Sequence, residues 1–279
     1  MFRPRSLGRR IAFNVFAWTL VIVIVFPLIW MILTSLKPQS ELFLIPPGFL
    51  PEEITFEHYR RLLTETPFLR YLRNSTVLAA ATTLVVIVIA TLGAHSLTRF
   101  SYPGREFLAR AVLFTYLLPS VVLIIPLYFL MIKAGLGNTL ASLIIAYTTF
   151  ALPYALWLLR SFMAGIPDDL EAAAMVDGAS RMRAFVDVIL PQALPGIIST
   201  ALFTAILAWN EYLYALVLVN SDEVRPLTTG VMSMLVTSFN IEWSLLMAAS
   251  VMMSVPLIFV FVFLQKYLTR GFGAGAIKG

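Results

Sequence analysis

The sequence predicts an all-α membrane protein with six transmembrane helices, cytoplasmic N- and C-termini, and a cytoplasmic two-helix loop between spans four and five. Of its 279 residues, 59% are hydrophobic and only 13% are charged, whereas soluble domains carry about a quarter charged residues. The mean hydropathy is +0.88, and the apolar runs are long enough for helices of about 20 residues to cross a bilayer. We expect a single domain over residues 1–279, with spans at about 11–35, 77–97, 107–132, 140–160, 194–219 and 244–268.

The first expected span follows a basic N-terminal segment. Arg3, Arg5, Arg9 and Arg10 precede the apolar run 11–35. A cleaved signal peptide is the alternative interpretation, but this run is longer than the apolar core of a signal peptide, and no A-x-A-like cleavage site follows it. We therefore expect a retained membrane span.

A polar, proline-containing outer loop is expected at 36–73. Part of it shows apolar residues at helical spacing, which predicts an amphipathic helix at the outer interface. The apolar positions are Phe56, Tyr59, Leu62 and Leu63. His58 falls on the polar side of this helix, where a solvated side chain is a simpler interpretation than a ligand.

The next three spans are distinguished by small residues and prolines. The second is rich in Ala, Thr and Gly, which favours close packing inside a membrane bundle. His95 lies near its inner end with no acid or second His nearby in sequence, so we expect a packing role rather than a proton relay. The third span contains Pro119 and Pro126, and the fourth contains Pro153; prolines at such depth kink membrane helices.

The segment 166–191 interrupts the apolar runs and is expected to form two short helices. Three carboxylates follow Pro167, at the helix end where the dipole favours negative charge. Asp177-Gly178 is a helix-stop pair, because Gly tolerates the left-handed conformation that ends a helix. Ser180 can cap the second helix, and Pro191 is expected to close it. A rigid helix–turn–helix between two spans suits the docking of a partner on one side of the membrane.

The fifth expected span contains Trp209-Asn210-Glu211. An acid inside a span costs about 2.5–3.5 kcal/mol on insertion scales, so it should face protein or a water-filled path. Two interpretations stay open: a structural hydrogen bond to another helix, or a polar lining of a translocation path by Asn210 and Glu211. The last outer loop is expected at 220–243, and a Gly-rich tail follows the sixth span.

The distribution of basic residues predicts which side each loop faces. With the N-terminus inside, most of the 20 Lys and Arg residues fall in the inner segments, as the positive-inside rule requires. This places 166–191 in the cytoplasm, where a soluble partner can reach it. The net charge of +5 is thus explained by topology, and we expect no nucleic-acid binding.

Several functions are excluded by absent motifs. The chain has no Cys, which removes disulfides, thiol catalysis and Cys-ligated zinc. It lacks a G-x-x-x-x-G-K-[ST] loop and an H-E-x-x-H motif, and we expect no catalytic residue, metal site or bound cofactor. Any energy source must come from a partner or an ion gradient.

The interruption resembles the cytoplasmic coupling loop, or EAA loop, of ATP-binding-cassette importer permeases. That pattern runs Glu-Ala-Ala, three residues, Gly, nine residues, Ile-x-Leu-Pro. Aligned on Gly178, its Glu falls on Ala172, and Glu171 stands one place early. The matching positions are Leu170, Ala173, Ala174, Asp177, Gly178, Ala179, Phe185, Leu190 and Pro191.

The resemblance covers nearly the whole chain and is to the second permease subunit of maltose/trehalose-type carbohydrate importers. Further landmarks are Asn74-Ser75, Gly135-Leu136, Asn138-Thr139, the Phe150–Pro153 run, Trp209-Asn210-Glu211 and the terminal Gly275–Gly279 run. It implies a multi-pass subunit of a bacterial or archaeal cytoplasmic membrane that carries a sugar such as trehalose or maltose. The implied partners are a second permease subunit, a dimer of cytoplasmic ATP-binding subunits that hold ATP and Mg, and an extracytoplasmic solute-binding protein.

The resemblance also implies roles for individual residues. Contacts to the ATPase would come from Leu170, Glu171, Ala173, Ala174, Asp177, Gly178, Phe185, Leu190 and Pro191. Among these, Leu170 and Phe185 would be apolar anchors, and Glu171 and Asp177 would offer charge pairs or simply favour helix ends. The loop 220–243 would contact the binding protein, and Ile277 and Lys278 in the tail would reach the ATPase interface.

Two other hypotheses compete with this one. A secondary sugar transporter driven by an ion gradient would work alone, and Glu211 is its only support. A membrane scaffold or receptor without transport would have no ATPase partner.

Overall fold

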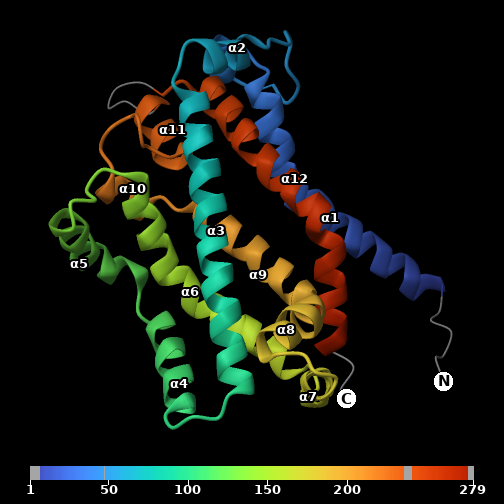
Figure 1. Cartoon of the computed structure of the whole chain (residues 1–279). Helices are drawn as coiled ribbons and strands as arrows, with labels where there is room; N and C mark the ends of the chain where they lie inside the picture. Colours follow the sequence, from blue (N-terminus) through green and yellow to red (C-terminus); the bar gives the residue numbers. More distant parts are fainter. Residues whose placement is uncertain (1–6, 47, 236–240, 276–279) are drawn as a thin grey trace. The chain divides into compact units, whose positions relative to one another are not determined.

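The computed structural model describes residues 7–46, 48–235 and 241–275, and its regular elements there are all helices (Figure 1). The chain forms two compact units. The first comprises residues 1–67 and 231–255, and the second comprises residues 68–230 and 256–279. The expectation of an all-α membrane protein is confirmed.

The elements follow one another in the order expected of a multi-span chain. The first unit begins with α1 (Leu7–Ser35), η1 (Gln39–Phe43) and α2 (Glu57–Thr64). The second holds α3 (Phe68–Arg99), α4 (Arg105–Tyr116), α5 (Ser120–Lys133), α6 (Leu140–Ala164), α7 (Asp168–Val176), α8 (Arg181–Ala184), η2 (Phe185–Ile189), α9 (Leu190–Asn210) and α10 (Leu213–Leu218). The residues of α11 (Leu227–Leu235) and α12 (Trp243–Gly275) are divided between the two units.

Five helical segments among the described residues are long and apolar enough to cross a membrane, and a bent pair could form a sixth span. The pair is α4 and α5, which meet at 98°. The sequence predicted one kinked span at 107–132, but the structure replaces the kink by a break of nearly a right angle. Pro119 precedes α5 with an extended ψ of 123°. It has no amide hydrogen and disfavours the helical conformation of Leu118.

The fifth expected span is also two helices. The structure ends α9 at Asn210, and α10 begins at Leu213 after an extended Glu211. The segment predicted as a span at about 194–219 therefore contains a helix break near its outer end. The acid interrupts the helix because its carboxylate caps α10, as described below.

The core of the second unit is formed by α3, α6 and α9, which lie side by side (Figure 1). Its contact surface is lined by small residues, including Ala90 and Ala94 of α3 and Ala151 and Ala155 of α6. Small side chains let membrane helices approach closely. At Gly196 of α9, an added Cβ would lie 2.5 Å from Cγ of Phe162. Any larger residue at this position would therefore force Phe162 or the backbone to move. The predicted close packing of the second span is thus present.

In the first unit, the helix expected within 36–73 is present as α2, but its histidine is buried and not in solvent. His58 is buried, and its Nε2–H donates to the carbonyl oxygen of Lys37 at 3.0 Å. The prediction of a solvated His58 is therefore wrong. Leu62 is fully buried on the same face. The imidazole can be buried there because the Lys37 carbonyl, just after the end of α1, accepts its hydrogen bond.

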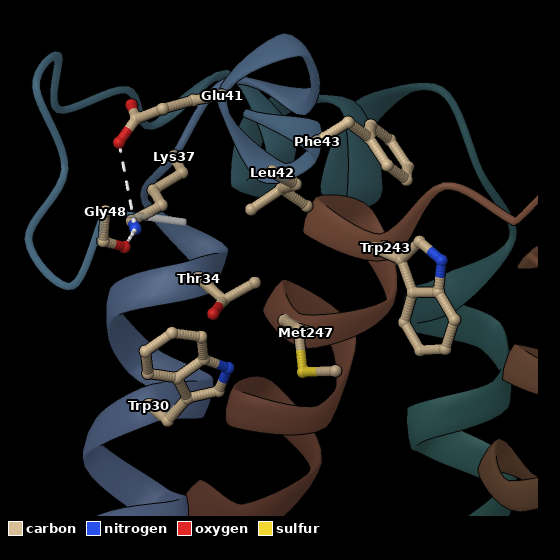
Figure 2. A pocket seen from close by; sticks show the side chains of 9 residues that line it. All are labelled: Trp30, Thr34, Lys37, Glu41, Leu42, Phe43, Gly48, Trp243 and Met247. Atoms are coloured by element: carbon tan, nitrogen blue, oxygen red, sulfur yellow. Dashed lines mark hydrogen bonds and ion pairs between the residues drawn. The ribbon is translucent and has the colours of Figure 1, made fainter. Parts of the chain in front are cut away.

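A buried ion pair closes the segment that follows α1. Figure 2 shows the ammonium group of Lys37 turned toward both Glu41 and the carbonyl oxygen of Gly48. The Lys37 and Glu41 charges are 3.7 Å apart, and Glu41 also accepts the amide hydrogen of Glu52 at 3.1 Å. Lys37, Glu41 and Gly48 line a pocket of about 320 Å³ together with Trp30 and Trp243.

Replacing Lys37 by Ala is expected to lower the free energy of unfolding by about 3–5 kcal/mol, because the buried Glu41 carboxylate would lose its counter-ion. Thermal unfolding of the detergent-purified chain measures this. Lys133→Ala, at an exposed position in the turn after α5, is the matched control. Equal unfolding midpoints for the two variants would contradict the buried pair.

Candidate functional site

The two-helix loop, residues 166–191, links α6 to α9. Pro167 precedes α7 with φ −57° and ψ 136°, and the first turn of α7 contains Asp168, Asp169 and Glu171. Proline is well suited to a helix start, and carboxylates there are favoured by the helix dipole. The sequence-based prediction of this helix start agrees with the structure.

The end of α7 depends on the backbone of one glycine. Gly178 has φ +92°, its amide donates to the carbonyl of Met175 at 3.1 Å, and the Ala179 amide donates to that of Ala174 at 3.0 Å. This pair of bonds is the Schellman arrangement. A Cβ at Gly178 would meet nothing within 4 Å, so glycine is required for its conformation and not for space.

The second helix of the loop does not end at Pro191, so that prediction is wrong. Ser180 caps α8 by accepting the amide hydrogen of Arg183 at 3.3 Å, as predicted. The helix then continues through η2, a π-helical turn, into α9, giving one helical segment over Arg181–Asn210. Pro191 falls in the first turn of α9, just after η2 has interrupted the ordinary i−4 bonding. A missing amide hydrogen is tolerated there.

An ionic cluster, in which Arg99 and Glu171 are buried and Asp168 is exposed, attaches α7 to the end of α3. The guanidinium of Arg99 pairs with Asp168, lies 3.4 Å (Nε) from Oε2 of Glu171, and donates to the carbonyl of Ile166 at 2.8 Å. Glu171 is only 6% exposed. The Glu171 carboxylate is therefore used within the chain, and its contact with an ATPase stays a prediction. No local pattern in the sequence pairs Arg99 with α7.

Aromatic contacts complete this attachment. Phe185 is 5% exposed and belongs to the core with Leu159 and Met163. Its ring centroid lies 4.4 Å from that of His95, whose Nε2 is 3.8 Å from Oε1 of Glu171. The Phe185 ring is therefore covered within this chain, and its role as an anchor for an ATPase stays a prediction. His95 has the packing role predicted, but beside an acid that sequence distance concealed.

Other side chains of the two-helix loop are exposed, and some of them are apolar. Val176 is 87% and Met182 65% exposed, and Leu170 is 39% exposed. We call these three residues the apolar face of the loop. Of the other residues predicted to contact an ATPase, Ala173, Asp177, Gly178 and Pro191 are exposed, and Ala174 and Leu190 are half-buried. Val176 and Met182 were missed, although two large apolar residues within a polar segment are a usable signal.

Glu211 lies where α9 and α10 meet. Its carboxylate accepts the amide hydrogens of Tyr214 at 3.0 Å and Ala215 at 3.2 Å. Its carbonyl oxygen accepts the hydroxyl of Thr228 at 2.7 Å. The structural interpretation left open by the sequence is thus present, as a cap within the chain. Asn210 beside it is exposed, and its amide nitrogen donates to the carbonyl of Ile206 at 2.8 Å.

The start of α3 holds the segment that follows α10. Asn74 is fully buried, and its amide donates to the carbonyls of Glu223 and Arg225 at 2.9 Å each. Ser75 accepts the amide hydrogen of Leu227 at 2.8 Å. Buried side-chain amides and hydroxyls in this position satisfy loop backbone groups that water cannot reach. The part of 220–243 that lies in the second unit is therefore an ordered extension of the bundle.

Two predicted positions, Ile277 and Lys278, lie outside the described residues. Among those described, no group of three or more His, Asp or Glu residues is placed to hold a metal ion.

Comparisons with known proteins agree with this architecture. Residues 86–273 match the family described as binding-protein-dependent transport system inner membrane component. The chain is 36% identical over 275 residues to the diacetylchitobiose uptake system permease protein DasC of Streptomyces coelicolor, with 99% of each chain covered. It is 35% identical to the trehalose/maltose transport system permease protein MalG of Thermococcus litoralis, over 97% of this chain and 98% of the relative.

A solved structure shares the fold. A chain from a bacterial ABC transporter that imports the acidic polysaccharide alginate superposes with a TM-score of 0.83. The match covers 96% of this chain and 99% of that one, at 24% sequence identity. At this identity, the likeness establishes the fold alone.

Proposed function

The chain belongs to the family of binding-protein-dependent transport system inner membrane components and is a multi-pass permease subunit of a sugar ABC importer of the cell membrane; from this premise, we propose that its two-helix loop couples a separate ATPase to sugar movement. This chain contributes no ATPase of its own. ATP and Mg would be bound by the partner.

The observation that carries the proposal is the division of the two-helix loop into a fixed face and a free face. The fixed face is tied to α3 by Arg99 and Glu171 and to the core by Phe185. Movement of the loop would therefore move the spans with it. The free face exposes the apolar Leu170, Val176 and Met182, and an exposed apolar patch of this kind fits a protein groove.

The proposed mechanism needs only two states of the bundle. A partner that changes shape with its nucleotide, and that grips the apolar face, would favour one arrangement of the spans over the other. Glu171 has an internal role in this scheme, whereas Asp177 remains exposed for a charge contact. The cytoplasmic position of the loop and of both termini is part of the proposal, supported by the positive-inside bias.

The remaining partners follow from the family. We propose a second permease subunit beside this chain, a dimer of ATP-binding subunits at the two-helix loop and at the tail around Ile277 and Lys278, and an extracytoplasmic solute-binding protein at the loop 220–243. The family description names binding-protein dependence. DasC and MalG are named for diacetylchitobiose and for trehalose/maltose, which supports a di- or oligosaccharide such as trehalose or maltose. Asn210 and Glu211 would line the path.

The coupling role is tested by replacing Gly178 with Pro in the assembled complex. Proline cannot adopt φ +92°. It also lacks the amide hydrogen that residue 178 donates to the Met175 carbonyl, so the hydrogen bond that ends α7 would be lost. We expect ATP-driven sugar uptake into proteoliposomes to fall at least about tenfold, which corresponds to about 1.4 kcal/mol, while the permease still copurifies with its partner permease.

Gly178→Asn is the matched control, because Asn tolerates the left-handed conformation. It should retain most uptake. Normal uptake by the Gly178→Pro complex would overturn the coupling role. Copurification of the wild-type chain without any nucleotide-binding subunit would overturn the proposed partner.

A further inference from the structure

Two helix breaks meet in the second unit. One separates α4 from α5, and the other separates α9 from α10 (Figure 1). Tyr214 of α10 donates its hydroxyl hydrogen to the carbonyl of Ser120, the first residue of α5, at 2.7 Å. Broken helices leave backbone groups that must be buried in protein or face a water-filled cavity when they lie at membrane depth.

A pocket of about 350 Å³ lies at this meeting point. Its apolar wall is aromatic: Phe150 of α6 stacks on Tyr214 with ring centroids 5.5 Å apart, and Phe203 of α9 packs against Tyr154 at 4.7 Å. Phe203 is 44% exposed, so its ring is partly free. Ring faces of this kind suit the C–H faces of a sugar ring.

The same pocket contains polar groups, one of which has unused hydrogen-bonding capacity. The Glu211 carboxylate accepts the backbone amide hydrogens of Tyr214 and Ala215. Leu213 and Tyr147 also bond to it, so Glu211 has little capacity left for a ligand. Asn210 uses one amide hydrogen on the carbonyl of Ile206. The second amide hydrogen and two carbonyl lone pairs are then available to a ligand. A carboxylate and an amide beside aromatic rings are unsuited to lipid tails.

We propose that this pocket is a carbohydrate contact site on this subunit: Phe203 and Phe150 take the apolar face of a sugar ring, and Asn210, beside Glu211, bonds its hydroxyls. The proposal rests on the proposed transport function and adds that this chain itself contacts the sugar. Glu211 also caps α10, so its removal would disturb the fold. Asn210 and Phe203 are therefore the residues to test.

The test uses the assembled complex in proteoliposomes, with radiolabelled trehalose, maltose and N,N′-diacetylchitobiose as probes. For any probe that the wild type takes up, Asn210→Ala and Phe203→Leu are each expected to raise the half-saturating sugar concentration about fivefold to tenfold, the loss of one hydrogen bond or ring contact. Phe203→Trp keeps an aromatic face and should stay within about twofold of the wild type.

Phe129→Ala is the matched control, because Phe129 is a similarly exposed phenylalanine of α5 that does not line the pocket. Unchanged half-saturation for both Asn210→Ala and Phe203→Leu, in complexes that transport with ATP, would overturn the site and leave the proposed function standing. Equal increases for Phe203→Leu, Phe203→Trp and Phe129→Ala would also overturn it. Absence of ATP-driven uptake of all three sugars by the wild type would overturn the proposed function and this inference with it.

Discussion

Replacing Arg99 by Ala is expected to uncouple the transporter. The variant would leave the buried Glu171 without its guanidinium partner and would remove the bond to the Ile166 carbonyl. Breaking a buried ion pair in this way costs about 3–5 kcal/mol. The two-helix loop would then no longer be held to α3, and its movement would be poorly transmitted to the spans.

The measurement is the number of sugar molecules imported per ATP hydrolysed in proteoliposomes. We expect this ratio to fall about tenfold or more, because the attachment loses more than the 1.4 kcal/mol that corresponds to a factor of ten. Arg110→Ala removes an exposed basic residue of α4 and is the matched control. A ratio equal to that of the wild type, in an intact complex, would show that the Arg99 cluster is not part of the coupling.

Substituting Gly230 by Ala is expected to loosen the segment 220–230 from α3. The added Cβ would lie 2.2 Å from a ring carbon of Tyr71. That ring is fully buried, and its hydroxyl donates to Asp222 at 3.0 Å, so it cannot swing aside freely. Overpacking of this kind costs about 1–3 kcal/mol.

Thermal unfolding of the purified complex and limited proteolysis within 220–230 would register this loss. Gly93→Ala is the graded control: its Cβ would meet Cδ1 of Leu156 at 2.8 Å, which is the far end of a flexible side chain. We expect the Gly93 variant to be the more stable of the two. The reverse order would mean that Tyr71 yields more easily than its contacts indicate.

Local rules predicted the local features well. The stop at Gly178, the cap at Ser180 and the acidic first turn of α7 are each decided within a few residues, by backbone conformation and by helix ends. The same rules failed at Pro191, because the preceding π-helical turn makes the proline the start of a helix rather than its end.

The positions that failed share a cause. His58 was expected in solvent, but it is buried against the segment that follows α1. Glu211 was recognised as unusual from its cost in a membrane, yet its partners lie in α10, which no apolar pattern separates from α9. Periodicity reports that a residue is apolar or polar, not which neighbour will cover it.

The sequence by itself determined that this chain is a bundle of membrane helices with a polar two-helix loop. Apolar run length, glycine and proline placement and charge bias are properties of a chain in a bilayer, whatever the packing. The tertiary structure decided which face of the two-helix loop is free and where the two helix breaks meet. Both depend on side chains such as Arg99 and Glu171, which come together only when separate helices pack. Contacts between residues so far apart in the sequence produce no periodic pattern that could predict them.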